Sequence, residues 1–406
     1  MRLGYLYSRY PVPSQTFCDS EMLELERRGF ELVIASMYRP KTTVRHEYLD
    51  RFRAPVHYAP EKPQLEKLVK QAERTGRWPE KLIADHERKY GADYKAALRA
   101  RNALFFVDLF ERTGVRHFHV HFANRAAHTA VFVKAITGIP FSMTAHGQDF
   151  MTDLGSAELL QELCAAAEFV AAETDYSRDL LRARCPASAE KIFRVYNGID
   201  LQKMPGKLET RSAGPVRLLS VGRLVEFKGF EVLIDACAEL RRAGLKFSFE
   251  IIGDGPLRGE LEARIAAHDL GTVIHLSGEQ TQSYVLATMM ACDIFVLAAR
   301  VDDRGASDVF PTVIAEAMTA GKPVVSTTVA GIPELVQQDA TGLLVPPGDS
   351  NLLASALKKL IANETLRDEL GRAGSERIAS HFTIAQTIEP LLQLLTFGNN
   401  TAANAR

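Results

Sequence analysis

The sequence contains no long hydrophobic run and almost no net charge. No apolar stretch approaches the roughly 20 residues that a membrane-spanning helix needs, so an integral membrane protein is not expected. The formal net charge of −1 argues against a nucleic-acid-binding protein, because such proteins place many cations against phosphates. The first residues, MRLGYLYSRYP, turn polar after a few positions and predict a buried strand rather than a signal peptide.

Cysteine is scarce and scattered. The five cysteines form no C-x-x-C pair, which predicts reduced, structural thiols in a cytosolic protein. Residues 1–200 carry slightly more basic than acidic side chains, and this permits a weak peripheral association with the inner face of a membrane. We therefore expect a cytoplasmic protein.

The chain does contain a regular alternation of short apolar runs and amphipathic stretches. Its 406 residues, 46% of them hydrophobic, are enough for two domains. The expected strands of the first half are RLGYLY, ELVIASMY, FHVHF, FSMTAH and FVAA, with helices such as 15–28, 124–137 and 156–165 between them. A polar, helix-rich insertion over 63–112 predicts a solvated helical hairpin, with contact to an acceptor or a membrane as the alternative.

The second half repeats the alternation after a linker with Pro and Gly at Leu201–Pro215. Its expected strands are VRLLSVG, FSFEIIG, VIHLSG, DIFVLAA, PVVSTT and GLLVP. Strands that alternate with helices predict parallel sheets covered on both faces, so the expected fold class is α/β with two doubly wound domains in tandem. Ligands of such sheets bind beyond the carboxyl ends of the strands. The residues that follow each strand are therefore the candidates for function.

Two cations follow the first strand of the second half. Gly222 ends this strand, and Arg223 and Lys228 come next, five residues apart. A planar guanidinium and a compact ammonium suit the several oxygens of a diphosphate. The alternative is a pair of exposed surface cations. A second turn, at Gly253 in IIGDGP, is weak evidence for nucleotide binding when taken alone.

The stretch DVFPTVIAEAMTAGKPVV places a carboxylate on either side of a predicted helix start. Pro311 fits the first helical position, and Thr312 and Val313 would then offer free backbone N–H groups to a phosphate. Asp308 precedes the helix and Glu316 lies about one turn inside it, so both are expected to accept hydrogen bonds from ribose or hexose hydroxyls. Complementing the helix dipole is an alternative that fits Asp308 better than Glu316.

A histidine also ends a strand in the first half. His146 follows FSMTA, and Gly147 beside it would let a ligand approach the backbone closely. A lone histidine at a strand end is more often a structural hydrogen-bonding residue than a catalyst. His119, His121, His128 and Asp149 could together form a metal site. This interpretation is less favoured, because no third ligand follows the HVH pair at a suitable spacing.

Together these motifs resemble the retaining glycosyltransferases of family 4, which have two Rossmann-like domains facing a central cleft (the GT-B fold). The resemblance covers nearly the whole chain and is strongest in VYNGID, GRLVEFKG, GDGP, EAMTAGKPVVSTTVAGIPELV and TGLLVPPGD. The N-terminal PVPSQTF, HVHFA and TAHGQDF are similar to members that build exopolysaccharides and other cell-surface glycans. The resemblance implies an acceptor-side domain at 1–203, a nucleotide-sugar domain at 204–377, and a segment at 378–406 whose helix crosses back to the first domain.

The resemblance implies transfer of a sugar from a nucleotide-diphosphate donor to a glycan, lipid-linked or small-molecule acceptor, without a metal or another cofactor. Arg223 and Lys228 would neutralise the diphosphate, and Glu316 would hold the ribose hydroxyls. Asp308 and His146 would contact the donor sugar. The resemblance also implies that seven further residues contribute to donor binding: Gly222, Gly253, Phe310, Thr312, Val313, Ser14 and Gln15.

The sequence departs from the family pattern in two places. Asp308-Val309 stands where the family commonly has Glu-Gly, and SRYPVPSQTF replaces a Gly-Gly loop, so that Ser14 and Gln15 would offer backbone N–H groups there. Two other functions stay compatible with the chain: a nucleotide-sugar 2-epimerase on the same fold, and a catalytically inactive nucleotide-sugar-binding protein. The only feature that favours the inactive protein is Asp308 in place of the family's usual glutamate.

Overall fold

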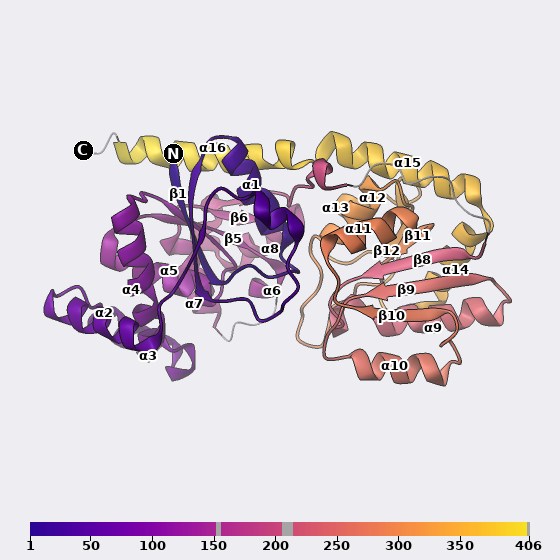
Figure 1. The fold of residues 1–406 in the computed structure, drawn as a ribbon, viewed down its shortest axis with the longest axis horizontal. Helices are drawn as coiled ribbons and strands as arrows, with labels where there is room; N and C mark the ends of the chain where they lie inside the picture. Colours follow the sequence, from indigo (N-terminus) through magenta and orange to yellow (C-terminus); the bar gives the residue numbers. More distant parts are fainter. Residues whose placement is uncertain (152–155, 205–213, 404–406) are drawn as a thin grey trace.

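The chain folds into two lobes, each built around a parallel β-sheet (Figure 1). The computed structural model describes residues 1–151, 156–204 and 214–403. The first sheet has seven strands in the order β3-β2-β1-β4-β5-β6-β7, and the second has six in the order β10-β9-β8-β11-β12-β13. Helices cover both sheets (Figure 1). The predicted fold class, two doubly wound α/β domains, is confirmed.

All of the predicted strands are present. In the first lobe they are β1 (Arg2–Arg9), β2 (Glu31–Tyr38), β4 (Phe118–His121), β5 (Phe141–Ala145) and β6 (Val170–Ala172). In the second lobe they are β8 (Val216–Val221), β9 (Phe247–Ile252), β10 (Ile274–Gly278), β11 (Ile294–Val296), β12 (Val324–Thr327) and β13 (Gly342–Val345). The two edge strands of the first sheet, β3 (Val56–Tyr58) and β7 (Ile192–Arg194), were not predicted, because neither is a buried apolar run like the equally short β6.

The helices of the first lobe are α1 (Thr16–Arg27), α2 (Lys62–Arg74), α3 (Glu80–Tyr90), α4 (Ala96–Thr113), α5 (Arg125–Thr137), α6 (Gly147–Phe150), α7 (Ala157–Ala166) and α8 (Asp175–Arg184). Those of the second lobe are α9 (Phe230–Arg242), α10 (Arg258–Ala267), α11 (Gln282–Ala291), α12 (Thr312–Thr319), α13 (Ile332–Leu335) and α14 (Ser350–Ala362). Two long helices, α15 (Glu364–His381) and α16 (Ile384–Ala403), follow. Among the described helices, none combines the length and the apolar character that crossing a membrane requires.

The predicted solvated hairpin at 63–112 is only partly correct. Helices α2 and α3 project from the far end of the first lobe (Figure 1) and are largely exposed. Helix α4, however, packs against α5 and α2, and Ala100, Ala103, Phe106 and Phe110 are fully buried. Their spacing of three and four residues gives this helix an apolar face, so α4 belongs to the core.

The C-terminal helices contact both lobes. Helix α15 packs on α12 of the second lobe, whereas α16 runs back over the first lobe to α1 (Figure 1). Ile388, Leu391 and Leu395 of α16 are buried in the same apolar cluster as Tyr5 of β1. Most of the linker predicted at Leu201–Pro215 lies outside the described residues. The boundaries at 203 and 377 stay predictions.

Candidate active site

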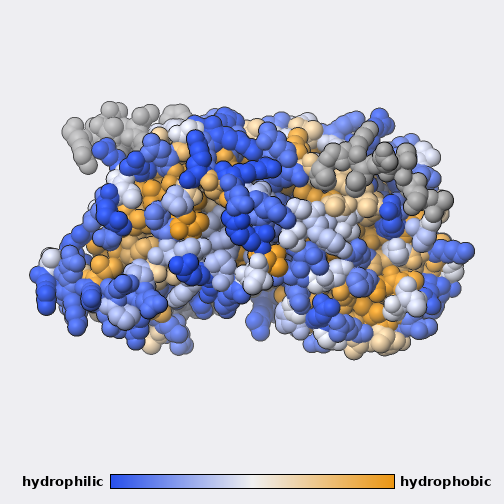
Figure 2. Space-filling view, viewed as in Figure 1, coloured by the Kyte–Doolittle hydropathy of each residue, from blue (hydrophilic) through white to orange (hydrophobic). Residues whose placement is uncertain are grey.

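A cavity of about 880 Å³ lies between the two lobes, at the carboxyl ends of both sheets. The first lobe lines it with the residues that follow β1, β4, β5 and β6, and the second with those that follow β8 and β9 and with the start of α12. Figure 2 shows the two lobes in contact above a notch at the lower edge of this face. The position agrees with the rule that doubly wound sheets bind ligands beyond their strand ends.

Two glycines bring the ends of β8 and β9 together. Gly253 has φ +141°, and a Cβ atom there would lie 1.9 Å from the carbonyl oxygen of Gly222, so only glycine fits. A Cβ atom on Gly222 would in turn meet Cδ of Lys228 at 3.2 Å. Both glycines line the cavity, and their role is to let the lysine stem and the neighbouring strand lie close to its floor.

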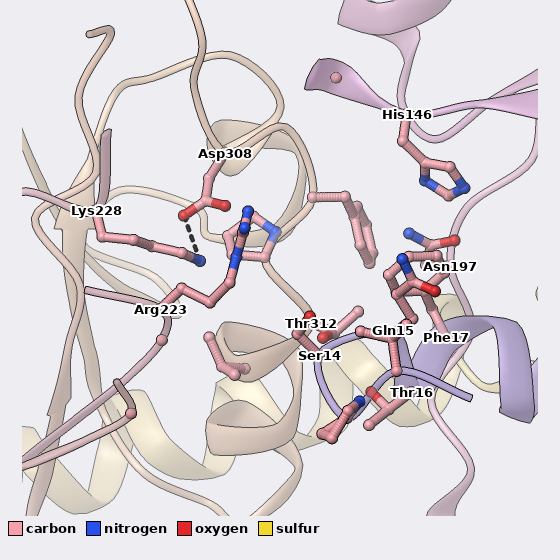
Figure 3. Close-up of a pocket in the computed structure, with 18 of the residues that line it drawn as sticks. Ser14, Gln15, Thr16, Phe17, His146, Asn197, Arg223, Lys228, Asp308 and Thr312 are labelled. Atoms are coloured by element: carbon pink, nitrogen blue, oxygen red, sulfur yellow. Dashed lines mark ion pairs between the residues drawn. The ribbon is translucent and has the colours of Figure 1, made fainter. Parts of the chain in front are cut away.

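The two predicted cations lie together, but only one is unpaired. The Nζ atom of Lys228 is 2.7 Å from Oδ2 of Asp308, and both side chains are more than four-fifths buried (Figure 3). The guanidinium of Arg223 lies beside this ion pair and has no side-chain partner among the described residues. The pairing of Asp308 with Lys228 was not predicted from the sequence.

Helix α12 begins at Thr312, with Pro311 as its N-cap, one position later than predicted. The backbone N–H groups of Thr312 and Val313 therefore belong to the first turn, where no helical partner exists for them, and both residues line the cavity. Glu316 lies one turn further along and is buried. Burial raises its pKa to about 7, although Lys203 and a hydrogen bond from Nε2 of Gln282, 3.3 Å from Oε1, oppose this.

His146 faces this group from the first lobe (Figure 3), but both of its ring nitrogens already have partners. Its Nδ1 atom contacts Oε1 of Glu173 at short range, and its Nε2 atom is 3.1 Å from Nδ1 of His121. The rings of Phe17 and Phe122 lie 4.7 and 4.5 Å from its centroid. A hydrogen bond from this ring to a sugar therefore requires one of the two partners to be displaced.

Sequence reasoning missed two polar residues in this wall. Glu173 directly follows β6, and Nδ2 of Asn197 donates to its Oε2 atom at 3.1 Å. Both residues line the cavity. The strand-end rule would have found Glu173, and Asn197 lies within the VYNGID motif, to which no role had been assigned.

The loop after β1 offers fewer free backbone N–H groups to a ligand than predicted. The N–H group of Gln15 donates to the carbonyl of Val12 at 2.9 Å, so this predicted donor is used within the loop. The Oε1 atom of Gln15 is buried and has no partner among the described residues. Ser14 is exposed at the cavity rim (Figure 3).

Phe310 forms part of an aromatic cluster that crosses between the lobes. Its ring centroid lies 5.6 Å from that of Tyr196 and 6.0 Å from that of Phe382. Phe310 also lines the cavity. The contact that the structure gives this predicted donor-binding residue is therefore hydrophobic.

A side chain of the second lobe packs against Gly147. A Cβ atom at this position would lie 2.2 Å from Cγ2 of Val309, which is buried among residues of the first lobe. Gly147 lines the cavity, and the close approach of a ligand to its backbone stays a prediction. The valine that replaces the family's usual glycine fills the space beside α6 and narrows the cavity there.

Of the four residues of the less favoured metal site, all of them described, the structure brings together only His119 and His121. Within the described part of the chain, one group has ligand atoms close enough for an ion, formed by Glu21, His119 and His121. Both ring nitrogens of His119 are already 2.8 and 2.9 Å from the hydroxyls of Ser142 and Thr144. Glu21 is hydrogen-bonded to His121 directly. These polar atoms are satisfied by one another, so the donor set does not fit a metal.

Comparisons with known proteins agree with this architecture. Residues 208–377 match the family model described as Glycosyl transferases group 1, and residues 15–203 match the model described as Glycosyltransferase Family 4. The chain is 30% identical to the amylovoran biosynthesis glycosyltransferase AmsK of Erwinia amylovora, over 90% of this chain and 91% of that protein. It is 28% identical to the putative colanic acid biosynthesis glycosyltransferase WcaL of Escherichia coli K12, over 97% of this chain and all of that protein. In structure it is similar to Anabaena HepE in complex with UDP, with a TM-score of 0.73 and 18% identity over 98% of this chain and 100% of that one.

Proposed function

Because this chain belongs to the group 1 and family 4 glycosyltransferases, we propose that it transfers a sugar from a nucleotide-diphosphate donor to a glycan or lipid-linked acceptor in exopolysaccharide or cell-envelope glycan synthesis, with retention of configuration. The relatives AmsK and WcaL are named for amylovoran and colanic acid synthesis. HepE is a structural neighbour that binds UDP. These names support a UDP-sugar as the first donor to test.

One observation carries the donor assignment. Arg223, Lys228 and the first turn of α12 present positive charge and free N–H groups to one side of the cavity, and Glu316 lies next to them. A diphosphate fits between the cations and the helix start, because both favour negative charge. Glu316 would then accept the hydroxyls of the ribose.

The same residues account for catalysis in this proposal. As the bond to the donor sugar breaks, the sugar resembles an oxocarbenium ion and the diphosphate gains negative charge. Lys228 is held in place before the reaction by its ion pair with Asp308, so it would stabilise that charge without further reorganisation, and Arg223 would add a second positive charge beside it. The departing phosphate would take the acceptor proton on the same face of the sugar, which gives retention.

Donor consumption with and without an acceptor extract tests this function. Purified protein is incubated with UDP-glucose, UDP-galactose, UDP-N-acetylglucosamine or GDP-mannose, and nucleotide and sugar products are separated. A glycosyltransferase releases nucleoside diphosphate faster when acceptor is present. A 2-epimerase converts the donor with no acceptor, and an inactive binding protein shifts its melting temperature with donor but forms no product.

Independence from a metal is part of the proposal and is tested in the same assay. The two cations supply the charge that a divalent ion would otherwise supply at the leaving group. We expect turnover to be unchanged by a chelator. Activity that is lost with the chelator and restored by manganese would contradict this assignment.

A further inference from the structure

Behind the cavity wall, four ionisable side chains form one continuous hydrogen-bonded chain. Glu173 contacts His146, the Nε2 atom of His146 is 3.1 Å from Nδ1 of His121, and Nε2 of His121 is 3.0 Å from Oε1 of Glu21. The hydroxyl of Tyr5 donates to the same Glu21 oxygen at 2.6 Å. All four ionisable residues are buried, and the chain links the cavity to helix α1.

The number of protons in this chain follows from its connections. Three contacts join Glu173, His146, His121 and Glu21, and each contact needs one proton between its two atoms. Two neutral imidazoles carry only one proton each. A third proton must therefore be present, either on one of the rings, which then carry one positive charge together, or on one of the two carboxyl groups.

A second pair of histidines in the same lobe shows the contrast. Nε2 of His86 is 2.8 Å from Glu162, and its Nδ1 atom is 2.9 Å from Nε2 of His128. Here two contacts are filled by the two protons of neutral rings. Burial lowers the pKa of His86 and lowers that of His128 to about 3, so this pair is neutral.

Glu173 and Glu21 favour the positively charged form of the His121–His146 pair. Burial opposes charge on His146, but Glu173, and then Asp149 and Glu21, raise its pKa above the usual value. Burial likewise favours the neutral acid of Glu21, yet His121 and His119 lower the pKa of Glu21 to about 2. The third proton is therefore held by the rings and not by Glu21.

The other titratable groups around the pair do not remove this charge. Burial lowers the pKa of His119 to about 3, and it raises the pKa values of Cys18 and Tyr7 well above their usual ranges, so all three are neutral. Tyr5 is also kept neutral, because burial and Glu21 raise its pKa. Burial raises the pKa of Asp149 to about 6, although backbone N–H groups and His146 oppose this.

We propose that Glu21, His121, His146 and Glu173 share three protons across two imidazole rings, and that Glu21 and His121 are positioning residues that keep Glu173 aimed at a sugar hydroxyl. Glu173 lies at the cavity wall between the ring of His146 and the amide of Asn197. Its oxygens retain lone pairs for a further donor. The proton count is independent of the proposed glycosyl transfer, whereas the identity of the hydroxyl as a sugar rests on it.

Histidine side-chain NMR tests the proton count on the whole protein without a ligand. The 11 histidines are labelled with ¹⁵N, and the two pairs are assigned with His121→Asn and His128→Asn. We expect the His121–His146 pair to carry three protons at neutral pH and the His86–His128 pair to carry two. In Glu21→Gln, which keeps the shape of the acceptor but removes its charge, the pair should lose its third proton about one pH unit lower or more. Glu162→Gln is the matched control and leaves that transition unchanged.

The positioning role is tested by turnover of whichever of UDP-glucose, UDP-galactose, UDP-N-acetylglucosamine and GDP-mannose the wild type consumes. We expect Glu21→Gln to lower kcat about tenfold, with little change in KM, and to move the alkaline limb of the kcat profile to lower pH. Glu162→Gln should leave that profile in place.

Each outcome decides one part of the proposal. Two neutral rings in the His121–His146 pair at neutral pH would overturn the proton count. A charged pair with an unaltered kcat profile in Glu21→Gln would overturn the positioning role. If the wild type consumes none of the four donors, the proposed function fails and the positioning role fails with it, while the NMR titration still decides the proton count.

Discussion

At the scale of single residues, the ion pair between Lys228 and Asp308 changes how the candidate site is understood. A carboxylate at Asp308 was expected to face a sugar, yet its Oδ2 atom lies 2.7 Å from the ammonium of Lys228. Asp is one methylene shorter than Glu, so the side chain reaches less far into the cavity. Asp308 would therefore set both the depth of the sugar pocket and the position of a phosphate-binding cation.

The first prediction concerns Asp308. We expect Asp308→Ala to reduce kcat more than it raises KM, since contacts to the sugar strengthen as the ring flattens. We expect Asp308→Glu to change the order of preference among donor sugars. If Asp308 only complements the helix dipole, worth about 0.3–1 kcal/mol of stability, Asp308→Ala would lower the melting temperature slightly and leave turnover unchanged.

The second prediction concerns the charge on Glu316. Its pKa is raised from 4.5 to about 7 in the folded protein, so the folded state holds the proton more tightly than the unfolded state. The stability that this proton gives is complete below pH 4.5 and is lost as the pH rises through about 7. Above that pH, Glu316→Gln should stabilise the protein by on the order of 1–3 kcal/mol while it weakens donor binding.

Denaturant unfolding at several pH values measures this effect. The gain from Glu316→Gln should shrink as the pH falls toward 4.5. The exposed Glu376→Gln serves as the control and should show no such dependence. A variant that is equally stable at all pH values would show that Glu316 is not held as a buried acid.

At the scale of elements, the approach of β8 to β9 depends on glycine. A Cβ atom on Gly253 would lie 1.9 Å from the Gly222 carbonyl oxygen, and its φ of +141° is unfavourable for other residues. We expect Gly253→Ala to destabilise the protein by about 2 kcal/mol or more. Gly259→Ala in α10 is the matched control, because its Cβ atom would meet nothing within 4 Å. Equal unfolding free energies for the two variants would contradict this account.

The elements that the sequence predicts best are those with a long, repeated pattern. The six strands of the second lobe were all predicted because each is an apolar run bounded by turns and helices. The edge strands β3 and β7 were not predicted because their residues are mostly not buried and form no apolar run, whereas the equally short β6 and β11 are fully buried. The many charged residues of 63–112 predict a solvated hairpin, whereas the burial of Phe106 and Phe110 places α4 in the core.

The sequence predicted several residues that line the candidate site, but not which of them contact one another. The strand-end rule identified Arg223, Lys228 and His146, all of which line one cavity. It could not show that Asp308 pairs with Lys228, because a loop conformation decides which carboxylate meets which cation. The contact between Gly147 and Val309 could not be predicted for a related reason, since the two residues are about 160 positions apart in sequence and only tertiary structure brings them close.

At the scale of the whole molecule, contacts on both sides of the cavity hold the two lobes together. Glu334 of the second lobe accepts hydrogen bonds from the backbone of Asp175 and Tyr176 at 2.9 Å each, at the start of α8. On another side, Nδ1 of His46 accepts the backbone N–H of Gln282 at 3.1 Å, and Thr42 donates to a carboxylate of the second lobe. Apolar contacts also join the lobes, since Phe310 packs against Tyr196 and Val309 is buried among residues of the first lobe, so opening of the cavity would expose apolar area as well.

A prediction about domain closure follows. We expect Glu334→Ala to expand the protein in small-angle X-ray scattering, because α8 loses its carboxylate partner across the lobes. Saturating donor should compact the wild type and restore part of the compaction in the variant. The exposed Glu376→Ala is the control. Identical scattering of Glu334→Ala and wild type, with and without donor, would show that these contacts do not govern closure.

The central claim is that one wall of the cavity binds a nucleotide diphosphate through Arg223, Lys228 and the start of α12, with Glu316 beside it. Calorimetric titration of UDP into the wild type, Arg223→Ala and Glu316→Ala tests this claim most directly. At about pH 8, above the pKa of about 7 of Glu316, we predict measurable binding to the wild type and a loss of about 1.5–3 kcal/mol of binding free energy in each variant, since each would remove a charged hydrogen-bonding group. Binding of UDP with unchanged affinity to both variants would contradict the account.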